Sequence, residues 1–403
     1  MLKIKMLSIF ICIWMLFSYG EVCAQPVSSQ TPEAIVKSYL NQKMKVIISH
    51  DLDTLDNYFS KLDAKAASYL AFIKIHLLQD YLLSYSNSNL IIERLSPKVK
   101  VINLQYENND CFVKASLKSV VYWNAANPLG PPLKGTLSEQ HYIRLSREGS
   151  IWRVVSDKFQ SDHQYSESCE STPSDLLNRT LAYSKKELSA SLTRSKESPP
   201  TKLQLVPHHA PSDKERNNLY NREGAYNWAN KYWEKYSGNF VNLGDEAWEG
   251  GDCTNFISQC LKAGGADNDM QGSYKWYYIR NGRSGNKGDN FSWTWSTARG
   301  LNSVILGNFN KKEFGPKGIE KVISGDSSYT SELGEFIDIG DILQYEFEAG
   351  NGIKHSAIIV GKIFNSEAKS YQPVISTHSF DSWNLPWTKN AYKTHFVHIT
   401  GIN

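Results

Sequence analysis

The stretch WEGGDCTNFISQCLKAGG, from Trp248 to Gly265, decides the fold of the C-terminal half of the chain. A glycine pair permits a tight turn, and Asp252 after it is a residue type that starts helices. The apolar residues beyond it fall on one helical face: Phe256, Ile257, Cys260 and Leu261. A second glycine pair ends the helix. We therefore expect a buried helix whose first turn holds Cys253.

Cys253 is the candidate nucleophile because of this position. The reactive form of cysteine is the thiolate, and the N-terminus of a helix favours its negative charge. Free backbone N–H groups in the first turn also suit an oxyanion. A small buried structural cysteine is the ordinary alternative. A histidine partner elsewhere in the chain favours the catalytic interpretation.

That partner lies in GDILQYEFEAGNGIKHSAIIVGKIF, from Gly340 to Phe364. Alternation predicts a strand from Asp341 to Phe347, followed by a turn and a second strand from Ser356 to Gly361. His355 opens the second strand, where an imidazole is well placed to act as the base for a thiol. A satisfied core histidine is the alternative.

A third strand is expected from Tyr371 to Thr377, ending at His378. If it lies antiparallel to the second strand, His378 comes beside His355 and orients it by a hydrogen bond, the third role in a triad. Asp381 and Asn384, just beyond, are the alternatives for that role.

The last 185 residues or so resemble the bacterial putative amidase domain, a branch of the papain-like cysteine hydrolases related to NlpC and CHAP cell-wall enzymes. The matching pieces are YNREGAYNWANKYW, GGDCTNFISQCLKAGG, IGDILQYEF, KHSAIIV and ISTHSFDSWNLPW, in this order. The resemblance implies a papain-like α+β domain. It also implies that Cys253 is the nucleophile, His355 the base and His378 the polar third member.

The same resemblance implies a substrate-binding role for Asp252, and we place Asn255 with it. In NlpC enzymes the Asp before the cysteine helps to bind a substrate amine, although helix capping alone would explain Asp252. The oxyanion hole must differ from that of papain, because Ala247 stands where papain has glutamine. The region from Ala266 to Glu335 is expected to shape the cleft and its specificity.

The N-terminal part is predicted to be an α+β module over residues 28–160, with helices first and an antiparallel sheet after them. Its segment HYIRLSREGSIWRVVSDKF resembles the last hairpin of the nuclear-transport-factor-like cone fold. Such cones often serve as binding or spacer modules. We find no catalytic set there, and His141 and His163 are expected on the surface. Residues 161–218 are predicted to be a linker with one helical piece.

Residues 1–24 are predicted to be a signal peptide, since an apolar run follows Lys3 and Lys5 and is too short to span a bilayer. The mature chain is then expected outside the cytoplasm, in the cell envelope or secreted, with no membrane span. Cys253 and Cys260, seven residues apart on one helix, would lie about 10.5 Å apart. A disulfide needs Cα atoms within about 7 Å, so these two are not expected to pair.

Charge and motifs narrow the function further. The formal net charge of +3, from 44 basic and 41 acidic side chains, gives no reason to expect a nucleic-acid partner. His395 and His398 would face opposite sides of a strand, so we expect no metal, and no phosphate loop or other cofactor motif is present. The sequence leaves the oligomeric state open.

The sequence thus predicts an exported cysteine-dependent amide hydrolase, and peptide or peptidoglycan-like amides are its expected substrates. Three alternatives stay open. The first is a non-catalytic peptide- or glycan-binding module on the same scaffold, and the second is a cysteine acyltransferase. In the third, the N-terminal module carries the function.

Overall fold

The computed structural model describes most of the chain from Thr31 onward. The described ranges are 31–83, 92–123, 134–161, 173–197, 220–244, 252–271, 274–282, 288–311, 315–324, 329–365, 370–379, 381–387 and 391–402. The predicted signal peptide lies outside these residues.

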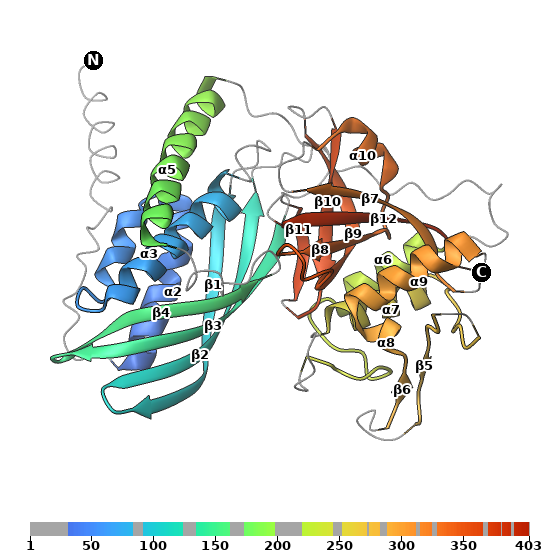
Figure 1. Cartoon of the computed structure of the whole chain (residues 1–403), viewed down its shortest axis with the longest axis horizontal. Helices are drawn as coiled ribbons and strands as arrows, with labels where there is room; N and C mark the ends of the chain where they lie inside the picture. The colour runs from blue at the N-terminus through green and yellow to red at the C-terminus, as the bar shows by residue number, and fades with distance from the viewer. Residues whose placement is uncertain are drawn as a thin grey trace, which may run out of the picture.

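The N-terminal module consists of helices followed by a long antiparallel sheet (Figure 1). Its helical elements are α2 (Pro32–Ser49), η1 (Leu52–Asn57), α3 (Ala64–His76), η2 (Leu77–Leu83) and α5 (Ser174–Glu197). Its strands are β1 (Ile92–Glu107), β2 (Asp110–Trp123), β3 (Lys134–Glu148) and β4 (Ile151–Ser161), paired in that order. The predicted order of helices before strands is confirmed.

Local chemistry explains where these elements begin and turn. Thr31 caps α2, because its hydroxyl accepts a hydrogen bond from the Ala34 N–H, and Pro32 occupies the first helical position. Asn108 has φ of +52° in the turn between β1 and β2, a conformation that asparagine tolerates better than most residues. The strand β2 alternates between buried and more exposed side chains along its whole length.

Two expectations for the N-terminal part are corrected. The helix α5 packs against α3 and η2, burying Leu177 and Leu188, so it belongs to the module and not to a linker. His141 is fully buried, because it lies on β3 in phase with the core residues Ile143 and Leu145. His163 lies outside the described residues.

The C-terminal module places helices against a second antiparallel sheet (Figure 1). Its helices are α6 (Arg222–Tyr232), α7 (Cys253–Ala263), α8 (Trp293–Ser296), α9 (Ala298–Lys311) and α10 (Ser331–Phe336). Its strands are β5 (Tyr278–Ile279), β6 (Asn290–Phe291), β7 (Lys317–Ser324), β8 (Ile342–Glu346), β9 (His355–Asn365), β10 (Ser370–Thr377), β11 (Ser382–Pro386) and β12 (Lys393–Gly401).

The strand order across the C-terminal sheet is β11-β10-β9-β8-β12-β7, with β5 and β6 paired separately. The helix α7 packs on β9, and α9 packs on β7. The predicted strands before, at and after His355 are confirmed, and so is the helix that begins at Cys253, which ends at Ala263 with Gly264 as its C-cap. The α+β fold class is confirmed for the chain.

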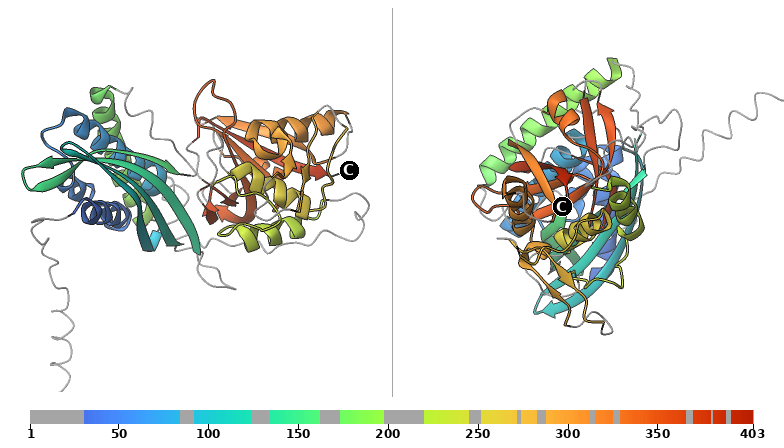
Figure 2. Two further views of the ribbon diagram at one scale, coloured as in Figure 1. Left: turned by 90° about the horizontal axis from the view of Figure 1, so that it is seen from below. Right: turned by 90° about the vertical axis from the view of Figure 1, so that its right-hand side faces the viewer.

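The two sheets meet edge to edge. Trp383 of β11 pairs with Thr136 of β3, which joins the strands of both modules into one continuous sheet. Figure 2 shows the two bodies side by side. Among the described helices, none combines the length and apolar character needed to cross a membrane.

Candidate active site

Cys253 is the first residue of α7 and is only 2% exposed. Its thiol lies 3.7 Å from the Thr254 hydroxyl, which in turn lies 3.1 Å from the hydroxyl of Ser356 on β9. The cysteine therefore sits where a helix N-terminus meets the start of the central strand. Gly250, Gly251 and Ala247, which the sequence places around the thiol, lie outside the described residues.

His355 is the first residue of β9, and its side chain lies within hydrogen-bond reach of the Cys253 thiol. Burial raises the pKa of the Cys253 thiol, but the polar contacts around it, first among them the charge and hydrogen bond of His355, bring the pKa below the usual value. A backbone hydrogen bond from Ser356 and the Thr254 hydroxyl lower it further. The geometry thus favours a thiolate beside an imidazolium.

The hydroxyl of Thr377, at the end of β10, is the polar partner of the His355 ring. Its oxygen lies 3.2 Å from His355 Nε2 and 2.9 Å from the backbone oxygens of Ser356 and His378. Because its one hydrogen goes to a backbone oxygen, the hydroxyl accepts a hydrogen bond from Nε2–H. This leaves Nδ1 of His355 as the basic nitrogen.

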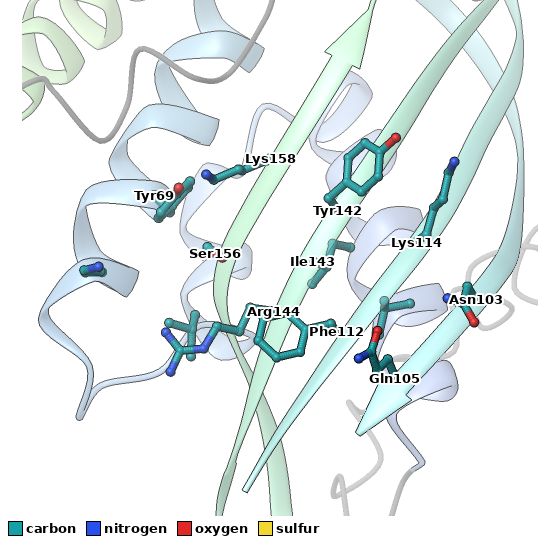
Figure 3. A pocket seen from close by; sticks show the side chains of 13 residues that line it. Tyr69, Asn103, Gln105, Phe112, Lys114, Tyr142, Ile143, Arg144, Ser156 and Lys158 are labelled. Atoms are coloured by element: carbon teal, nitrogen blue, oxygen red, sulfur yellow. The ribbon is translucent and has the colours of Figure 1, made fainter. Parts of the chain in front are cut away.

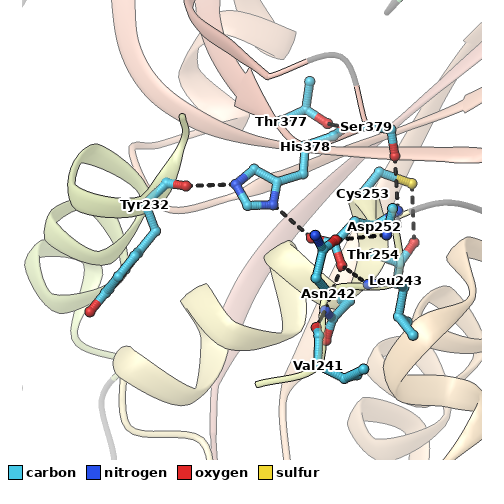
Figure 4. Close-up of polar contacts among 12 residues, drawn as sticks. Tyr232, Val241, Asn242, Leu243, Asp252, Cys253, Thr254, Thr377, His378 and Ser379 are labelled. Carbon is cyan, nitrogen blue, oxygen red and sulfur yellow. Dashed lines mark hydrogen bonds and ion pairs between the residues drawn. The ribbon is translucent and has the colours of Figure 1, made fainter. Parts of the chain in front are cut away.

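His378 has a different position from the one predicted (Figure 4). Its Nδ1 lies 2.7 Å from Asp252 Oδ2, and its Nε2 lies 2.6 Å from the backbone oxygen of Tyr232. Both ring nitrogens are therefore engaged away from His355. The strand ends at Thr377, and the turn that follows carries the His378 ring over Phe256, with ring centroids 4.0 Å apart.

The two alternatives for the third position also point elsewhere. Asp381 Oδ2 lies 4.0 Å from Lys118 Nζ of the N-terminal module. Asn384 donates a hydrogen bond to the backbone oxygen of Lys134. Both side chains serve the contact between modules, so Thr377 is the residue that the structure places on His355.

Asp252 and Asn255, the predicted substrate-binding residues, are both fully buried. Asp252 Oδ1 accepts hydrogen bonds from the Leu243 N–H and from Asn255 Nδ2, while its Oδ2 faces His378. Asn255 also donates to the Val241 oxygen and accepts from Trp295 Nε1. A substrate would have to break these bonds to reach either side chain, so the structure gives them a supporting role.

Asp252 nevertheless shapes the site. Its side chain makes no capping hydrogen bond to α7. Its backbone N–H donates to Ser379 Oγ at 2.9 Å, and its carboxylate holds His378. Asp252 therefore fixes the residue before Cys253 to the turn that follows β10, a role that a capping pattern in the sequence does not indicate.

His395 and His398, the other histidines described in the C-terminal module, have partners outside this site. His395 contacts Glu320 and Glu346, whereas His398 contacts Asp341. Within the described ranges no three metal-ligating side chains come together. Cys253 and Cys260 form no disulfide with each other.

Thr377 is the site residue that sequence reasoning missed. A threonine at the end of a strand is common, and its contact with His355 depends on the register between β9 and β10. The sequence did predict that the strand ending at Thr377 lies beside the strand that begins with His355. That prediction placed both Thr377 and His378 near His355 but did not choose between them.

Comparison with known proteins gives a family for the C-terminal module. Residues 219–400 match the model of the family described as Putative amidase domain. The uncharacterized protein YhbB of Bacillus subtilis (strain 168) is 28% identical over 172 residues. That match covers 42% of this chain and 44% of YhbB, which is less than half of the relative's length.

Among solved structures, the chain is similar to the Putative Scytalone Dehydratase of Novosphingobium aromaticivorans DSM 12444, with 8% identity and a TM-score of 0.22. That match covers 32% of this chain and 81% of the other. The Kfla4162 protein of Kribbella flavida matches with 10% identity and a TM-score of 0.23, covering 35% of this chain and 97% of the other. These scores are too low to carry an argument about function.

Proposed function

We propose that the C-terminal module is a papain-like cysteine hydrolase that cleaves amide bonds with Cys253 as nucleophile and His355 as base. The observation that carries this proposal is the placement of a buried thiol at a helix N-terminus within hydrogen-bond reach of the His355 imidazole, an arrangement that lowers the pKa of the thiol. The match to the Putative amidase domain model supports an amide as the bond that is cleaved.

The reaction follows from the positions of these groups. His355 Nδ1 removes the thiol proton, and the thiolate attacks the carbonyl carbon of the amide. The negative oxygen of the tetrahedral intermediate is stabilised near the N-terminus of α7. The intermediate collapses as His355 returns the proton to the leaving amine, and a thioester on Cys253 remains. Water, deprotonated by His355, then hydrolyses the thioester and restores the thiol.

Two groups position this pair without touching the substrate. The Thr377 hydroxyl holds the His355 ring so that Nδ1 carries the lone pair. The Asp252–His378 pair anchors the residue before Cys253 to the backbone of Tyr232 on α6. In this proposal Thr377 takes the orienting role that the sequence had suggested for His378.

The proposed substrates are peptide amides of the cell wall, and the proposed location is the cell envelope or its surroundings. The signal-peptide pattern in residues 1–24 and the resemblance to cell-wall hydrolases motivate this choice.

The test combines a substrate assay with thiol labelling. The chain is incubated with purified cell-wall fragments, the products are read by mass spectrometry, and Cys253→Ala is run beside it. We expect new amine termini with the natural chain and none with the variant. Full hydrolysis by Cys253→Ala would overturn the mechanism, and transfer to an added amine would identify an acyltransferase instead.

Iodoacetamide labelling tests the thiol without a substrate. We expect Cys253 to react with a midpoint below the ordinary thiol pKa of 9.0, and His355→Ala to shift that midpoint upward. Cys260 is the internal control, because burial raises the pKa of its thiol well above the usual value. Equal labelling of Cys253 and Cys260 in the folded chain would argue against an activated nucleophile and in favour of a binding module.

A further inference from the structure

A hollow of about 500 Å³ lies on the sheet of the N-terminal module, far along the chain from Cys253 (Figure 3). This volume falls in the range of about 300–1,000 Å³ that is usual for ligand pockets. The lining residues come from α3 and all four strands: Lys65, Tyr69, Asn103, Gln105, Phe112, Val113, Lys114, Tyr142, Ile143, Arg144, Val155, Ser156 and Lys158.

All the charged side chains that line the hollow are basic. Lys65, Lys114, Arg144 and Lys158 line the hollow, and the lining holds no Asp or Glu. Asp110, outside the lining, holds the Arg144 guanidinium through Nε at 2.9 Å and Nη2 at 2.7 Å. A fixed guanidinium with further donors is well suited to a carboxylate or phosphate. The hollow thus fits an anion.

Aromatic rings lie between these cations. Phe112 is 40% exposed and Tyr142 is 44% exposed, although both belong to inner strands of the module's sheet. Tyr142 pairs across the strands with Lys114 on one side and Lys158 on the other. The Lys114 ammonium lies 5.5 Å from the centre of the Tyr142 ring. An exposed ring flanked by cations offers an apolar face and charge in one place.

The remaining polar side chains are neutral. Asn103, Gln105 and Ser156 line the same hollow and can donate and accept hydrogen bonds. This combination suits a ligand that carries hydroxyl groups, an apolar ring face and a negative charge. An acidic peptide carries the negative charge but not the array of hydroxyl groups that Asn103, Gln105 and Ser156 can bind. A nucleic-acid-binding domain is usually more basic than this chain, whose sequence pI is about 8.3.

We propose that this hollow binds an acidic saccharide, with a sugar ring on Tyr142 and its carboxylate or phosphate held by Lys114 and Arg144. The N-terminal module is then a glycan-binding module beside the C-terminal site. The inference does not rest on Cys253, because binding needs no chemistry at the thiol.

The test uses the full chain and titration calorimetry with three probes: oligogalacturonate, its fully methyl-esterified form, and single-stranded oligo(dT). We expect oligogalacturonate to bind and to weaken with added salt. The neutral ester should bind at least about tenfold more weakly, since one lost charge-assisted contact is worth roughly tenfold. Oligo(dT) should bind more weakly than oligogalacturonate.

Variants locate the site. Lys114→Gln and Tyr142→Ala should each weaken oligogalacturonate binding about tenfold, whereas Lys321→Gln on β7 of the other module should leave it unchanged. Both lining side chains reach solvent, and circular dichroism checks that the variants fold. Equal binding of the neutral ester, tighter binding of oligo(dT), or unchanged binding by both lining variants would overturn the proposal. Cys253→Ala should bind oligogalacturonate as tightly as the natural chain does. A failure of the binding proposal can therefore be distinguished from a failure of the hydrolase proposal.

Discussion

At the scale of single residues, the Thr377 hydroxyl decides how the base is presented. It accepts a hydrogen bond from His355 Nε2 and thereby leaves Nδ1 for the thiol. Thr377→Val keeps the shape of the side chain but removes this acceptor. A net hydrogen bond is worth about 0.5–1.5 kcal/mol, so we expect hydrolysis and Cys253 alkylation to fall about threefold to tenfold.

The pH profile separates this role from a loss of folding. If Thr377 fixes the ring tautomer, Thr377→Val should raise the midpoint of the alkylation profile as well as lower the rate. Thr400→Val makes the same chemical change at an exposed site on β12 and should alter neither value. A slower rate with an unmoved midpoint in Thr377→Val would assign the residue to packing alone.

The sequence allowed part of the site to be predicted, for a physical reason. Cys253 and His355 were identifiable because each stands at the start of an element with a strong periodic pattern. The roles of Thr377 and His378 were not, because they depend on where β10 ends. The strand ends at Thr377, and two residues later Ser379 has φ of +77°, where the backbone turns away.

At the scale of elements, α2, β3 and β4 share a buried ionic network. Lys43 Nζ lies 2.7 Å from Glu139 Oε2, and His141 lies between Glu139 and Asp157. The Tyr39 hydroxyl donates to Asp157 as well. Burial alone lowers the pKa of His141, but the charge of Asp157 and the hydrogen bonds of both carboxylates raise it above its usual value. His141 therefore helps to balance two buried carboxylates.

This network predicts a pH-dependent stability. The folded pKa of His141 is raised above the unfolded value of 6.5, so its contribution is present below pH 6.5 and is lost as the pH rises through the folded pKa. His141→Gln leaves carboxylates without their charged partner and should cost about 3 kcal/mol at low pH, less at high pH. Urea unfolding of the full chain between about pH 6 and 9 measures the difference.

His50→Gln is the control for this experiment. His50 ends α2, and partial burial lowers its pKa, so any pH effect should have the opposite sign. A destabilisation by His141→Gln that grows with pH would contradict the prediction.

The network also shows the limit of sequence patterns at this scale. The strand around His141 was predicted, and its alternation placed His141 with Ile143 and Leu145, which are core residues. The expected surface position was wrong because a histidine is read as polar unless its partners are known. Those partners are Glu139 on β3 and Asp157 on the paired strand β4. Glu139 is in turn held by Lys43 on α2, 96 positions away in the chain.

At the scale of the whole molecule, one segment connects the junction of the modules to the candidate site. At its first end, Ser379 accepts the Asp252 N–H beside Cys253. At its other end, Trp383 pairs with Thr136 of β3, and Asn384 contacts Lys134. Ser379, Asp381 and Asn384 all have positive φ, a conformation that costs of order 1–3 kcal/mol each and persists only where surrounding contacts hold it.

No local pattern in the sequence indicated this junction. The contacts of β3 with β11 join residues about 250 positions apart, and strand pairing of that range depends on how both modules fold. The sequence therefore predicted each module, but it did not predict that the end of one sheet would support the turn beside Cys253.

Gly135 is the position at which this support can be tested. An added Cβ would lie 2.7 Å from the Trp383 oxygen, 2.8 Å from the Asn384 oxygen and 2.8 Å from the Trp123 ring. We expect Gly135→Ala to push β11 from β3 and to slow Cys253 alkylation severalfold, because the strained turn loses its support. Gly238→Ala, where a Cβ meets nothing within 4 Å, should leave the rate unchanged. A normal rate in Gly135→Ala, with proteolysis showing a loosened junction, would mean that the site stands without the N-terminal module.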